Sequence, residues 1–388
     1  MESISPFVSH IVSLLGVWGA GATLLCAVLF LWQLFFWLAR YNRIPSWRER
    51  RAASEYERIT PVSVVAILCE DYPYLEQTLP LLLSQDHPDF EVVLVYVGAD
   101  ADFRDTLDRL AQDDPRITVT QFNSDSPFAI SNKIAYNLGI KAARHPNVLL
   151  ATDDTTPASD NWLRLMSKGF SGSEVVIGYC GVAPGKGWAN RVMRADRLML
   201  SVRFLSAAMR GHPYRGMLGN VAFTGRLYFG SRGFTHLNMN IGEDDLYIQS
   251  IATGDNTSVI ISPACTVRQH FTGGLKYWRT MRAFYANAIH FYPRRVKVRL
   301  VMEPATRAAF VLAAVAAATV LPGWMKAIPA GMVVVRFALA WNVLRRISRR
   351  LGESGLKMAL LFGDIVGPAT EAGVWLRRKL GRDEGVWR

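Results

Sequence analysis

The sequence predicts an α/β fold: a mostly parallel, twisted sheet with helices on both faces, plus an N-terminal transmembrane helix and C-terminal membrane-associated helices. Two observations predict this class. Between residues 61 and 181, β-branched and aliphatic runs of strand length alternate with segments whose apolar residues recur at helical spacing. Long uncharged stretches lie on either side of this region, and 50% of the 388 residues are hydrophobic, which indicates lipid-facing surface.

The first 40 residues predict one transmembrane helix. From Ser3 to Ala39 there is no Asp, Glu, Lys or Arg, and the stretch is rich in Leu, Val, Phe and Trp from Ile11 onward. This exceeds the roughly 20 apolar residues that span a bilayer, and it is too long for the apolar part of a cleaved signal peptide. A buried helix of a soluble domain is the alternative.

A basic juxtamembrane linker at residues 41–60 follows this helix. Under the positive-inside rule, its arginines place the next domain in the cytoplasm, at an inner or plasma membrane. The arginines in and beside the linker are Arg40, Arg43, Arg48, Arg50, Arg51 and Arg58.

Residues 61–292 are expected to form the catalytic domain. Residues 61–69 and 90–97 read as strands, and the leucines between them recur at helical spacing, so together they predict a βαβ unit. In a parallel sheet, ligands bind beyond the carboxyl ends of the strands, which makes the residues after each strand the first candidates for a site. Further strands are predicted at 117–121, 148–151 and 175–181, and helices at 103–111 and 129–143.

Residues 293–388 are expected to hold a membrane-associated helical hairpin and an interfacial segment. Apolar stretches at 308–321 and 327–344 are separated by Pro322 and Gly323. The first stretch is short and Arg336 interrupts the second, so the sequence leaves open whether the hairpin spans the bilayer. Residues 356–380 are apolar with a basic end, as expected for an interfacial segment.

The positions of the charged residues and of the cysteines indicate which binding partners and metal sites to expect. The net charge is +12, but the basic residues gather beside the apolar segments, which favours anionic lipid headgroups over nucleic acid. The cysteines form no CxxC pair, so the sequence predicts neither a zinc site nor a disulfide framework.

An acidic turn at residues 151–157 (ATDDTTP) follows one predicted strand. Carboxylates there can bind a hard divalent cation whose other positions are filled by phosphates and water. The alternative is that Asp153 and Asp154 are ordinary turn residues.

A second acidic segment lies at residues 242–249 (GEDDLYIQ). An aspartate at the start of a helix can serve as a general base in a cleft. Simple helix capping is the alternative. Before it, residues 214–225 are punctuated by glycines, which either line an acceptor site or mark tight turns.

Taken in order, these parts resemble the large inverting family-2 glycosyltransferases with the A-type nucleotide-sugar fold. The resemblance covers roughly residues 61–292. Beyond the strands and the two acidic segments, it is carried by residues 84–88 (SQDHP), 90–92 (FEV) and 132–139 (NKIAYNLG).

The resemblance implies roles for the acidic residues. Asp154 corresponds to the last acid of the family's DxD motif and is expected to bind Mg²⁺ or Mn²⁺ together with the donor diphosphate. Thr152 stands where the first acid usually lies, and Asp153 is the residue that can compensate. Asp244 is expected to be the general base, with Glu243 as a supporting carboxylate. Asp245 is the rival base, or a contact to acceptor or phosphate.

Further donor and acceptor contacts are expected from the same resemblance. The family often binds the nucleobase with Asp-Asp-Gly-Ser after the second strand, where this chain has Tyr96-Val97-Gly98-Ala99. Glu70 and Asp71 are the substitutes. The remaining candidates are Lys133 near the nucleotide, His270 as a metal or phosphate contact, Trp278 as an acceptor-side wall, and Arg279 and Arg282 as phosphate contacts.

The implied function is transfer of a sugar, with inversion, from a UDP- or GDP-linked donor to a membrane-associated acceptor such as a lipid-linked glycan or a glycolipid precursor. Three alternatives remain. A non-catalytic membrane scaffold with a degenerate fold would explain Thr152 and the altered nucleobase segment. A polysaccharide synthase is disfavoured because there are few spanning segments and no intact QxxRW motif. A membrane-bound nucleotidyltransferase would leave the second acidic segment without a role.

Overall fold

The computed structural model describes residues 5–48, 59–68, 72–122, 132–236, 243–270 and 273–379. They form two compact units. The helical unit comprises Met1–Ser46, Pro293–Ile347 and Lys357–Arg388, and the sheet unit comprises Trp47–Tyr292 and Ser348–Leu356. The second segment of the sheet unit lies in the region that the sequence analysis assigned to the C-terminal membrane-associated part.

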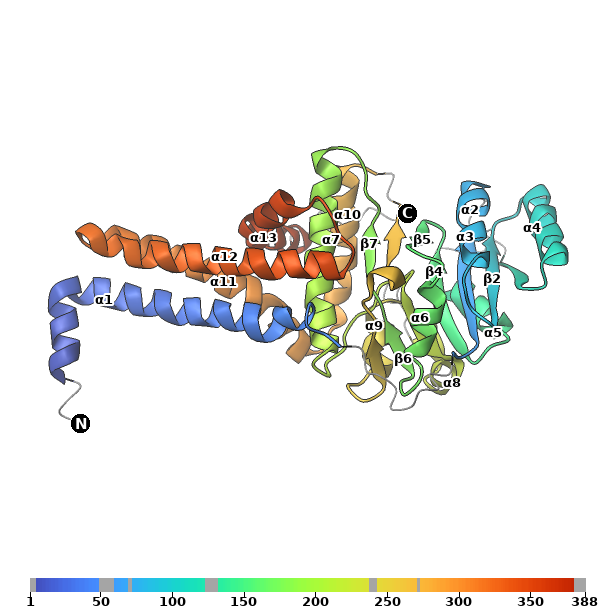
Figure 1. The fold of residues 1–388 in the computed structure, drawn as a ribbon, viewed down its shortest axis with the longest axis horizontal. Helices are drawn as coiled ribbons and strands as arrows, with labels where there is room; N and C mark the ends of the chain where they lie inside the picture. The colour runs from blue at the N-terminus through green and yellow to red at the C-terminus, as the bar shows by residue number, and fades with distance from the viewer. Residues whose placement is uncertain are drawn as a thin grey trace. The chain divides into compact units, whose positions relative to one another are not determined.

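The sheet unit is built on a seven-stranded sheet with the order β3-β2-β1-β4-β8-β6-β9 (Figure 1). Strands β1 to β4 are parallel, whereas β8 runs antiparallel to both β4 and β6. The mixed α/β class with a mostly parallel sheet is therefore confirmed. The strands are β1 (Val62–Leu68), β2 (Phe90–Val97), β3 (Ile117–Phe122), β4 (Asn147–Thr152), β6 (Val175–Ile177), β8 (Val221–Thr224) and β9 (Thr257–Val259).

A second, three-stranded sheet has the order β5-β10-β7. Residues 175–181 do not form the single predicted strand, because the chain leaves the large sheet at Gly178 and enters the small one. The Asn220 side chain occupies the space that a Cβ at Gly178 would need, and it donates hydrogen bonds to the carbonyl oxygens of Tyr179 (2.8 Å) and Cys265 (2.9 Å). The strands are β5 (Thr155–Pro157), β7 (Cys180–Val182) and β10 (Val267–Gln269).

Helices cover the large sheet. Gly139 of α5 faces Val65 and Val95, where a Cβ would overlap both valines, so this glycine lets the helix pack closely on the strands. The predicted helix between β1 and β2 is split in two, with Pro80 in the first turn of the second part. The helices of this unit are α2 (Tyr72–Gln77), α3 (Leu79–Leu83), α4 (Ala101–Asp113), α5 (Asn132–Ala142), α6 (Trp162–Lys168), α7 (Gly187–Ala208), α8 (Gly225–Gly230), α9 (Leu246–Ile251) and α10 (Leu275–Asn287).

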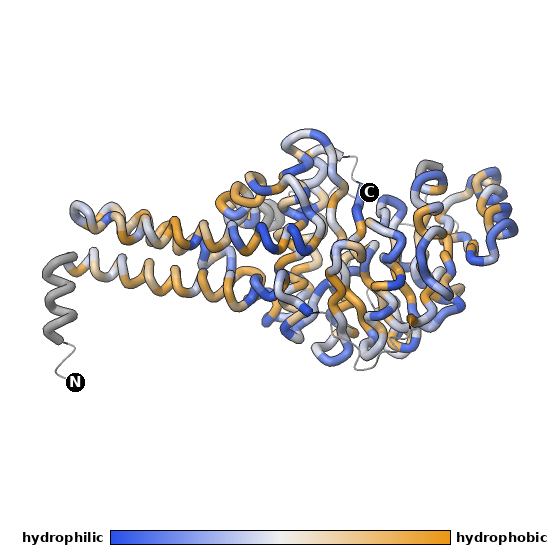
Figure 2. The backbone as a smooth tube through the Cα atoms, viewed as in Figure 1, coloured by the Kyte–Doolittle hydropathy of each residue, from blue (hydrophilic) through white to orange (hydrophobic). Residues whose placement is uncertain are grey.

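Within the described residues, three segments are long and apolar enough to cross a membrane: Gly16–Arg43, Arg294–Val320 and Gly323–Arg350. Figure 2 shows their hydrophobic colouring. The short apolar stretch at 308–321 gains full length because its helix begins at residue 294. The helices are α1 (Ser5–Phe35), which breaks at Gly16 with φ 68°, α11 (Arg294–Val320), α12 (Ala327–Arg350) and α13 (Lys357–Lys379).

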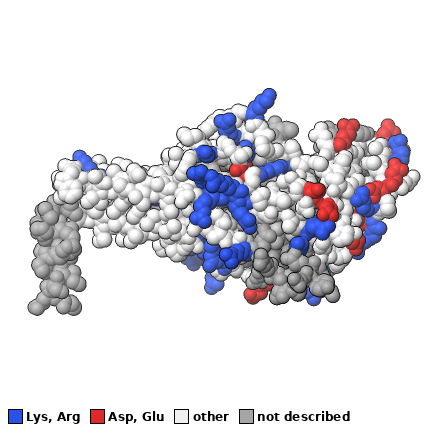
Figure 3. All heavy atoms as spheres, in the orientation of Figure 1, with Lys and Arg blue, Asp and Glu red and all other residues white. Residues whose placement is uncertain are grey.

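The basic residues of the helical unit share one end. Gln33 near the end of α1 donates a hydrogen bond to Thr306 in the middle of α11 (3.1 Å), and Arg40, just after α1, interacts electrostatically with Arg299 in the first turns of α11. Arg346 near the end of α12 donates to Asn42 (3.1 Å), so the end of α12 lies at the same level. Lys and Arg accordingly gather toward one end of the helices in Figure 3, and the other end is nearly uncharged.

Arg336 of α12 is buried and faces protein. Its guanidinium pairs with Asp364 of α13 and donates to Gln33 of α1 (3.3 Å). Arg307 of α11 donates to the same Asp364 (2.7 Å), and Gly367, one turn further along α13, provides the room that the Arg307 guanidinium occupies. The Asp364 carboxylate thereby pairs with two buried guanidinium groups and links α11, α12 and α13, and Glu303 of α11 pairs with Arg307 as well (3.6 Å).

Replacing Asp364 by Asn is expected to destabilise the helical unit strongly, because the buried Arg336 guanidinium would lose its paired carboxylate and Arg307 would keep only Glu303. Breaking a buried ion pair typically costs about 3–5 kcal/mol. Thermal unfolding of the detergent-solubilised chain measures the effect. Lys357→Gln, which removes an exposed charge from the same helix, is the control. Equal unfolding temperatures for the two variants would contradict the role given to Asp364.

Candidate active site

The acidic turn follows β4 at the carboxyl end of the parallel strands. The Thr155 hydroxyl donates to the Thr152 carbonyl oxygen (2.8 Å), which closes the turn. The Thr152 hydroxyl donates to one oxygen of Asp154 (2.8 Å), and the Gln269 amide donates to the other (2.6 Å). The His270 backbone N–H also donates to the Asp154 carbonyl oxygen (2.6 Å). Residues at and after the end of β10 therefore fix the position of the Asp154 carboxylate.

Cationic and aromatic side chains of α7 and α10 lie next to this turn. Arg197 donates to the Gln269 side-chain oxygen (2.8 Å), and its guanidinium lies over the Trp278 ring, 5.1 Å from the centroid. The Trp278 indole N–H donates to Asp196 (2.9 Å), which also pairs with Arg282. The surroundings of Asp154 are thus positively charged.

The second acidic segment holds three consecutive carboxylates that have different partners. Asp244 is buried and accepts a hydrogen bond from Arg215 (2.7 Å). Asp245 caps α9: it accepts from the Leu246 N–H (2.6 Å) and from the Tyr292 hydroxyl (2.6 Å). Glu243 is 8% exposed, and Lys133 of α5 is its neighbouring cation.

These environments raise the pKa values of Glu243 and Asp245 above their ordinary values. Burial raises the pKa of Glu243 to about 7, even though Lys133 opposes the shift. Burial and the Asp244 charge raise the pKa of Asp245 to about 6. Burial also lowers the pKa of Lys133, while Glu243 and Asp245 oppose that change. Burial lowers the pKa of the Arg215 guanidinium, but Asp244, Tyr292 and Asp245 together raise it above its usual value.

One short loop joins the two acidic segments. The Gly216 N–H donates to the Asp244 carbonyl oxygen (2.7 Å), and the Gly219 N–H donates to the Leu150 carbonyl oxygen just before the acidic turn (3.1 Å). Gly219 has φ 89°, and a Cβ there would press on Thr155. Three residues of chain span at most about 10 Å. The two acidic segments therefore flank the same loop.

The other predicted site residues differ in their burial and in their partners. Lys133 is buried and lies by Glu243 and Asp245. Trp278 and Arg282 are engaged by Asp196, and Arg279 is exposed. Glu70 and Asp71 lie outside the described residues.

Sequence reasoning missed the residues that hold the carboxylates in place. Arg215 stands in the glycine-punctuated stretch that had been considered only for its glycines. Gln269 and Arg197 carry no local signal of their relation to Asp154. The hydrogen bond from Gln269 to Asp154 joins residues 115 positions apart, and the one from Arg197 to Gln269 joins residues 72 positions apart.

The donor set suits a divalent cation that is held partly by substrate. Within the described residues there is no group of three or more His, Cys, Asp or Glu side chains able to enclose a metal. Mg²⁺ is commonly held by one or two carboxylates together with substrate phosphates, and Asp154 with neighbouring Asp153 offers that arrangement. The exposed His270 directs its Nε2 to the Thr156 hydroxyl (2.8 Å).

Residues 63–228 match the sequence pattern of the family described as glycosyl transferase family 2. No curated protein matches the chain in sequence. Among solved structures, a mannosyltransferase, PcManGT from Pyrobaculum calidifontis in complex with GDP-Man and Mn2+, is similar with a TM-score of 0.55 and 18% identity. The alignment covers 90% of this chain and 99% of that one. S. aureus TarS 1-349 in complex with UDP-GlcNAc is similar with a TM-score of 0.39 and 16% identity, over 76% of this chain and 92% of that one. The likeness to the mannosyltransferase confirms the A-type nucleotide-sugar fold.

Replacing Glu243 by Gln is expected to stabilise the protein increasingly as the pH rises. The pKa of Glu243 is about 7 in the folded chain against 4.5 ordinarily, so the folded state binds more protons between these values. The stability due to this group is therefore full below pH 4.5 and is lost as the pH rises through 7. Since Gln does not ionise, the variant should gain on the order of 2 kcal/mol over wild type between pH 5 and pH 8.

Thermal unfolding of both proteins across this pH range measures the difference. Glu76→Gln makes the same substitution at an exposed site of α2 and should show no such trend. A difference between Glu243→Gln and wild type that does not change with pH would contradict the assigned ionisation.

Proposed function

Because the chain carries a glycosyl transferase family 2 domain over residues 63–228, we propose that it is a metal-dependent inverting hexosyltransferase acting on a membrane-associated acceptor. The donor is a UDP- or GDP-linked sugar, and the acceptor is a lipid-linked glycan or a glycolipid precursor. The observation that carries the proposal is that two carboxylate clusters flank one loop beyond the carboxyl ends of the parallel strands.

The acidic turn is proposed to bind the donor diphosphate. Mg²⁺ or Mn²⁺, held by Asp154 and Asp153, would neutralise the charge that develops on the departing diphosphate. Thr152 and Gln269 keep the Asp154 carboxylate in one orientation, so little reorganisation is needed when the donor binds. Thr152 contributes a hydroxyl in place of the usual first acid, and Arg197 adds positive charge nearby.

The second acidic segment is proposed to take the proton of the acceptor hydroxyl. Asp244 is the base, because the Arg215 guanidinium holds its carboxylate in one orientation beside the loop that leads to the acidic turn. Glu243 is the rival, since a pKa of about 7 matches the usual requirement for a base at neutral pH. Attack from the side opposite the nucleotide would invert the configuration at the anomeric carbon.

The apolar segments support an acceptor at the membrane. Segments Gly16–Arg43, Arg294–Val320 and Gly323–Arg350 are long enough to span, and their basic residues gather at one end. By the positive-inside rule that end faces the cytoplasm, where nucleotide sugars are available to the sheet unit.

The first test is donor binding. Purified full-length protein is incubated with UDP- and GDP-sugars and Mn²⁺, and protection against thermal unfolding identifies the donor. GDP-mannose heads the series because the similar mannosyltransferase is described in complex with it. Release of nucleoside diphosphate then measures turnover. Donor protection without any turnover would favour the non-catalytic scaffold instead.

Asp154→Asn is expected to weaken Mn²⁺-dependent donor binding by roughly 100-fold or more, because loss of even an outer partner of a metal ligand costs about 10–100-fold. Calorimetry with the donor identified above measures the affinity. Asp113→Asn, at an exposed position of α4, is the control. Unchanged affinity in Asp154→Asn would remove Asp154 from the metal site.

Asp244→Asn is expected to lower turnover by about 10²–10⁴-fold while donor affinity stays close to wild type, because a general base acts on the acceptor proton. The variant Glu243→Gln tests whether Glu243, instead of Asp244, is the base. If Glu243 is the base, Glu243→Gln shows the large loss of turnover and no fall in its residual rate below about pH 7, whereas Asp244→Asn keeps near-normal turnover and that pH dependence. Near-normal turnover in Asp244→Asn would exclude Asp244 as the base.

A further inference from the structure

The segment Ser348–Leu356 comprises the last three residues of α12 and the six residues after it, and it belongs to the sheet unit. We call it the strap. The helix ends in a tight turn at Gly352, which has φ 65°, a conformation that glycine adopts readily. The Glu353 N–H donates to the Ser348 carbonyl oxygen (2.7 Å) and the Gly352 N–H to that of Arg349 (3.3 Å), the pattern of a Schellman cap. This cap sets the direction in which the Glu353 side chain leaves the helix end.

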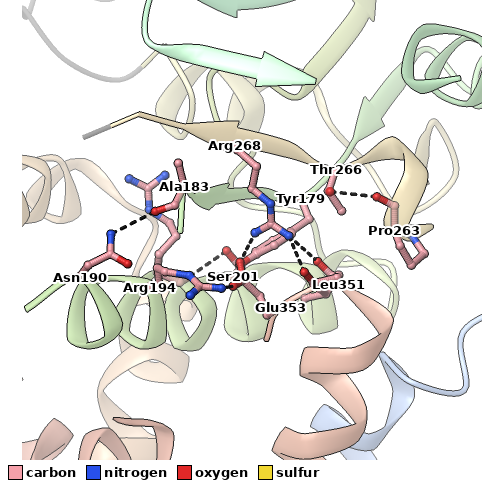
Figure 4. Close-up of polar contacts among 12 residues, drawn as sticks. Tyr179, Ala183, Asn190, Arg194, Ser201, Pro263, Thr266, Arg268, Leu351 and Glu353 are labelled. Carbon is pink, nitrogen blue, oxygen red and sulfur yellow. Dashed lines mark hydrogen bonds and ion pairs between the residues drawn. The ribbon is translucent and has the colours of Figure 1, made fainter. Parts of the chain in front are cut away.

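Glu353 is buried among three polar side chains of the sheet unit (Figure 4). One carboxylate oxygen accepts from Arg194 of α7 (2.6 Å). The other accepts from the Tyr179 hydroxyl (2.8 Å) and pairs with Arg268 of β10. Arg268 also donates to the carbonyl oxygen of Gly352 (2.8 Å), so it holds the backbone of the strap as well as its carboxylate.

The small sheet is shaped to receive this carboxylate. Gly181 of β7 lies where the pair crosses the strand, and a Cβ there would overlap both the Arg268 guanidinium and the Glu353 carboxylate. Leaving the buried Arg194 and the partly buried Arg268 without a counter-charge would be strongly unfavourable. A residue with a carboxylate is therefore required at position 353.

Strand β10 connects this ion pair to the acidic turn. Arg268 and Gln269 are neighbours in the strand, so their side chains point to opposite faces. Arg268 points to the strap, whereas Gln269 donates to the Asp154 carboxylate (2.6 Å) and pairs in register with Thr155. The same strand therefore holds Glu353 on one side and Asp154 on the other.

We propose that Glu353 is a positioning residue for the donor site: it fixes β10, and through Gln269 it fixes the Asp154 carboxylate. It also supplies the negative charge that offsets Arg194 and Arg268 close to the diphosphate site. This inference rests on the proposed function of Asp154. The strap thereby makes the region after the last candidate membrane span part of the catalytic machinery.

Glu353→Gln in the full-length protein tests the proposal through two affinities that should change in opposite directions. Loss of one negative charge near Asp154 is expected to weaken binding of Mn²⁺ alone by about tenfold. The same loss is expected to strengthen binding of UDP or GDP in EDTA, because the uncompensated guanidinium groups attract the diphosphate. A general structural defect would weaken both.

Glu91→Gln is the matched control. Glu91 is also a buried glutamate paired with an arginine, Arg144 (2.7 Å), but it lies in β2. This variant should lose thermal stability without the opposite changes in the two affinities. Unchanged affinities in Glu353→Gln, or equal losses of both, would overturn the proposal.

If Glu353→Gln does not fold, the variant Gln269→Met tests the proposal in its place. It cuts the link between β10 and Asp154 and leaves the Glu353 pairs in place, so Mn²⁺ affinity should again fall about tenfold. An unchanged Mn²⁺ affinity would overturn the inference. A wild-type protein that binds neither Mn²⁺ nor any nucleotide would overturn the proposed function, and the role of Glu353 with it.

Discussion

Pairing of buried arginines with carboxylates is the constraint on which much of this structure depends. A guanidinium group removed from water must meet a counter-charge, because the desolvation of an unpaired ion outweighs what packing can return. The chain meets this requirement at Arg215 and Asp244, at Arg268 and Glu353, and at Arg336 and Asp364. In each case the partners come from different elements, so the pair specifies how those elements pack.

Two of these pairs, Arg215 with Asp244 and Arg268 with Glu353, lie in or beside the candidate active site. Asp154 has no second carboxylate at position 152, yet Thr152 and Gln269 donate hydrogen bonds to both of its oxygens. Its orientation is therefore set by hydrogen bonding instead of by a cluster of acids. The positive charge that Arg197 places near Asp154 suits a doubly charged diphosphate, whereas the charge of Arg268 is offset by Glu353.

The three consecutive carboxylates at 243–245 illustrate how neighbouring positions acquire different chemistry. Asp244 has an arginine partner, Asp245 caps a helix and meets Tyr292, and Glu243 is buried with a pKa of about 7. Such separation of environments is how proteins assign an ionised and a protonated role to carboxylates in one site. Residue type alone does not distinguish these roles, because each depends on groups brought in from elsewhere in the chain.

The sequence by itself determined the features that arise from local periodicity and composition. These include the apolar N-terminal span, the parallel strands between 62 and 152, the helix predicted at 129–143, described as Asn132–Ala142, and the acidic turns at strand and helix ends. Local patterns are sufficient to predict these elements, because the periods of strands and helices are visible in the spacing of nearby apolar residues. The tertiary structure decided the division of residues 175–181 between two sheets and the partners of every catalytic candidate. It also decided the return of the strap to the sheet unit. The Arg215 to Asp244 and Arg268 to Glu353 contacts join residues 29 and 85 positions apart, and no local pattern encodes which distant charge will compensate a buried one.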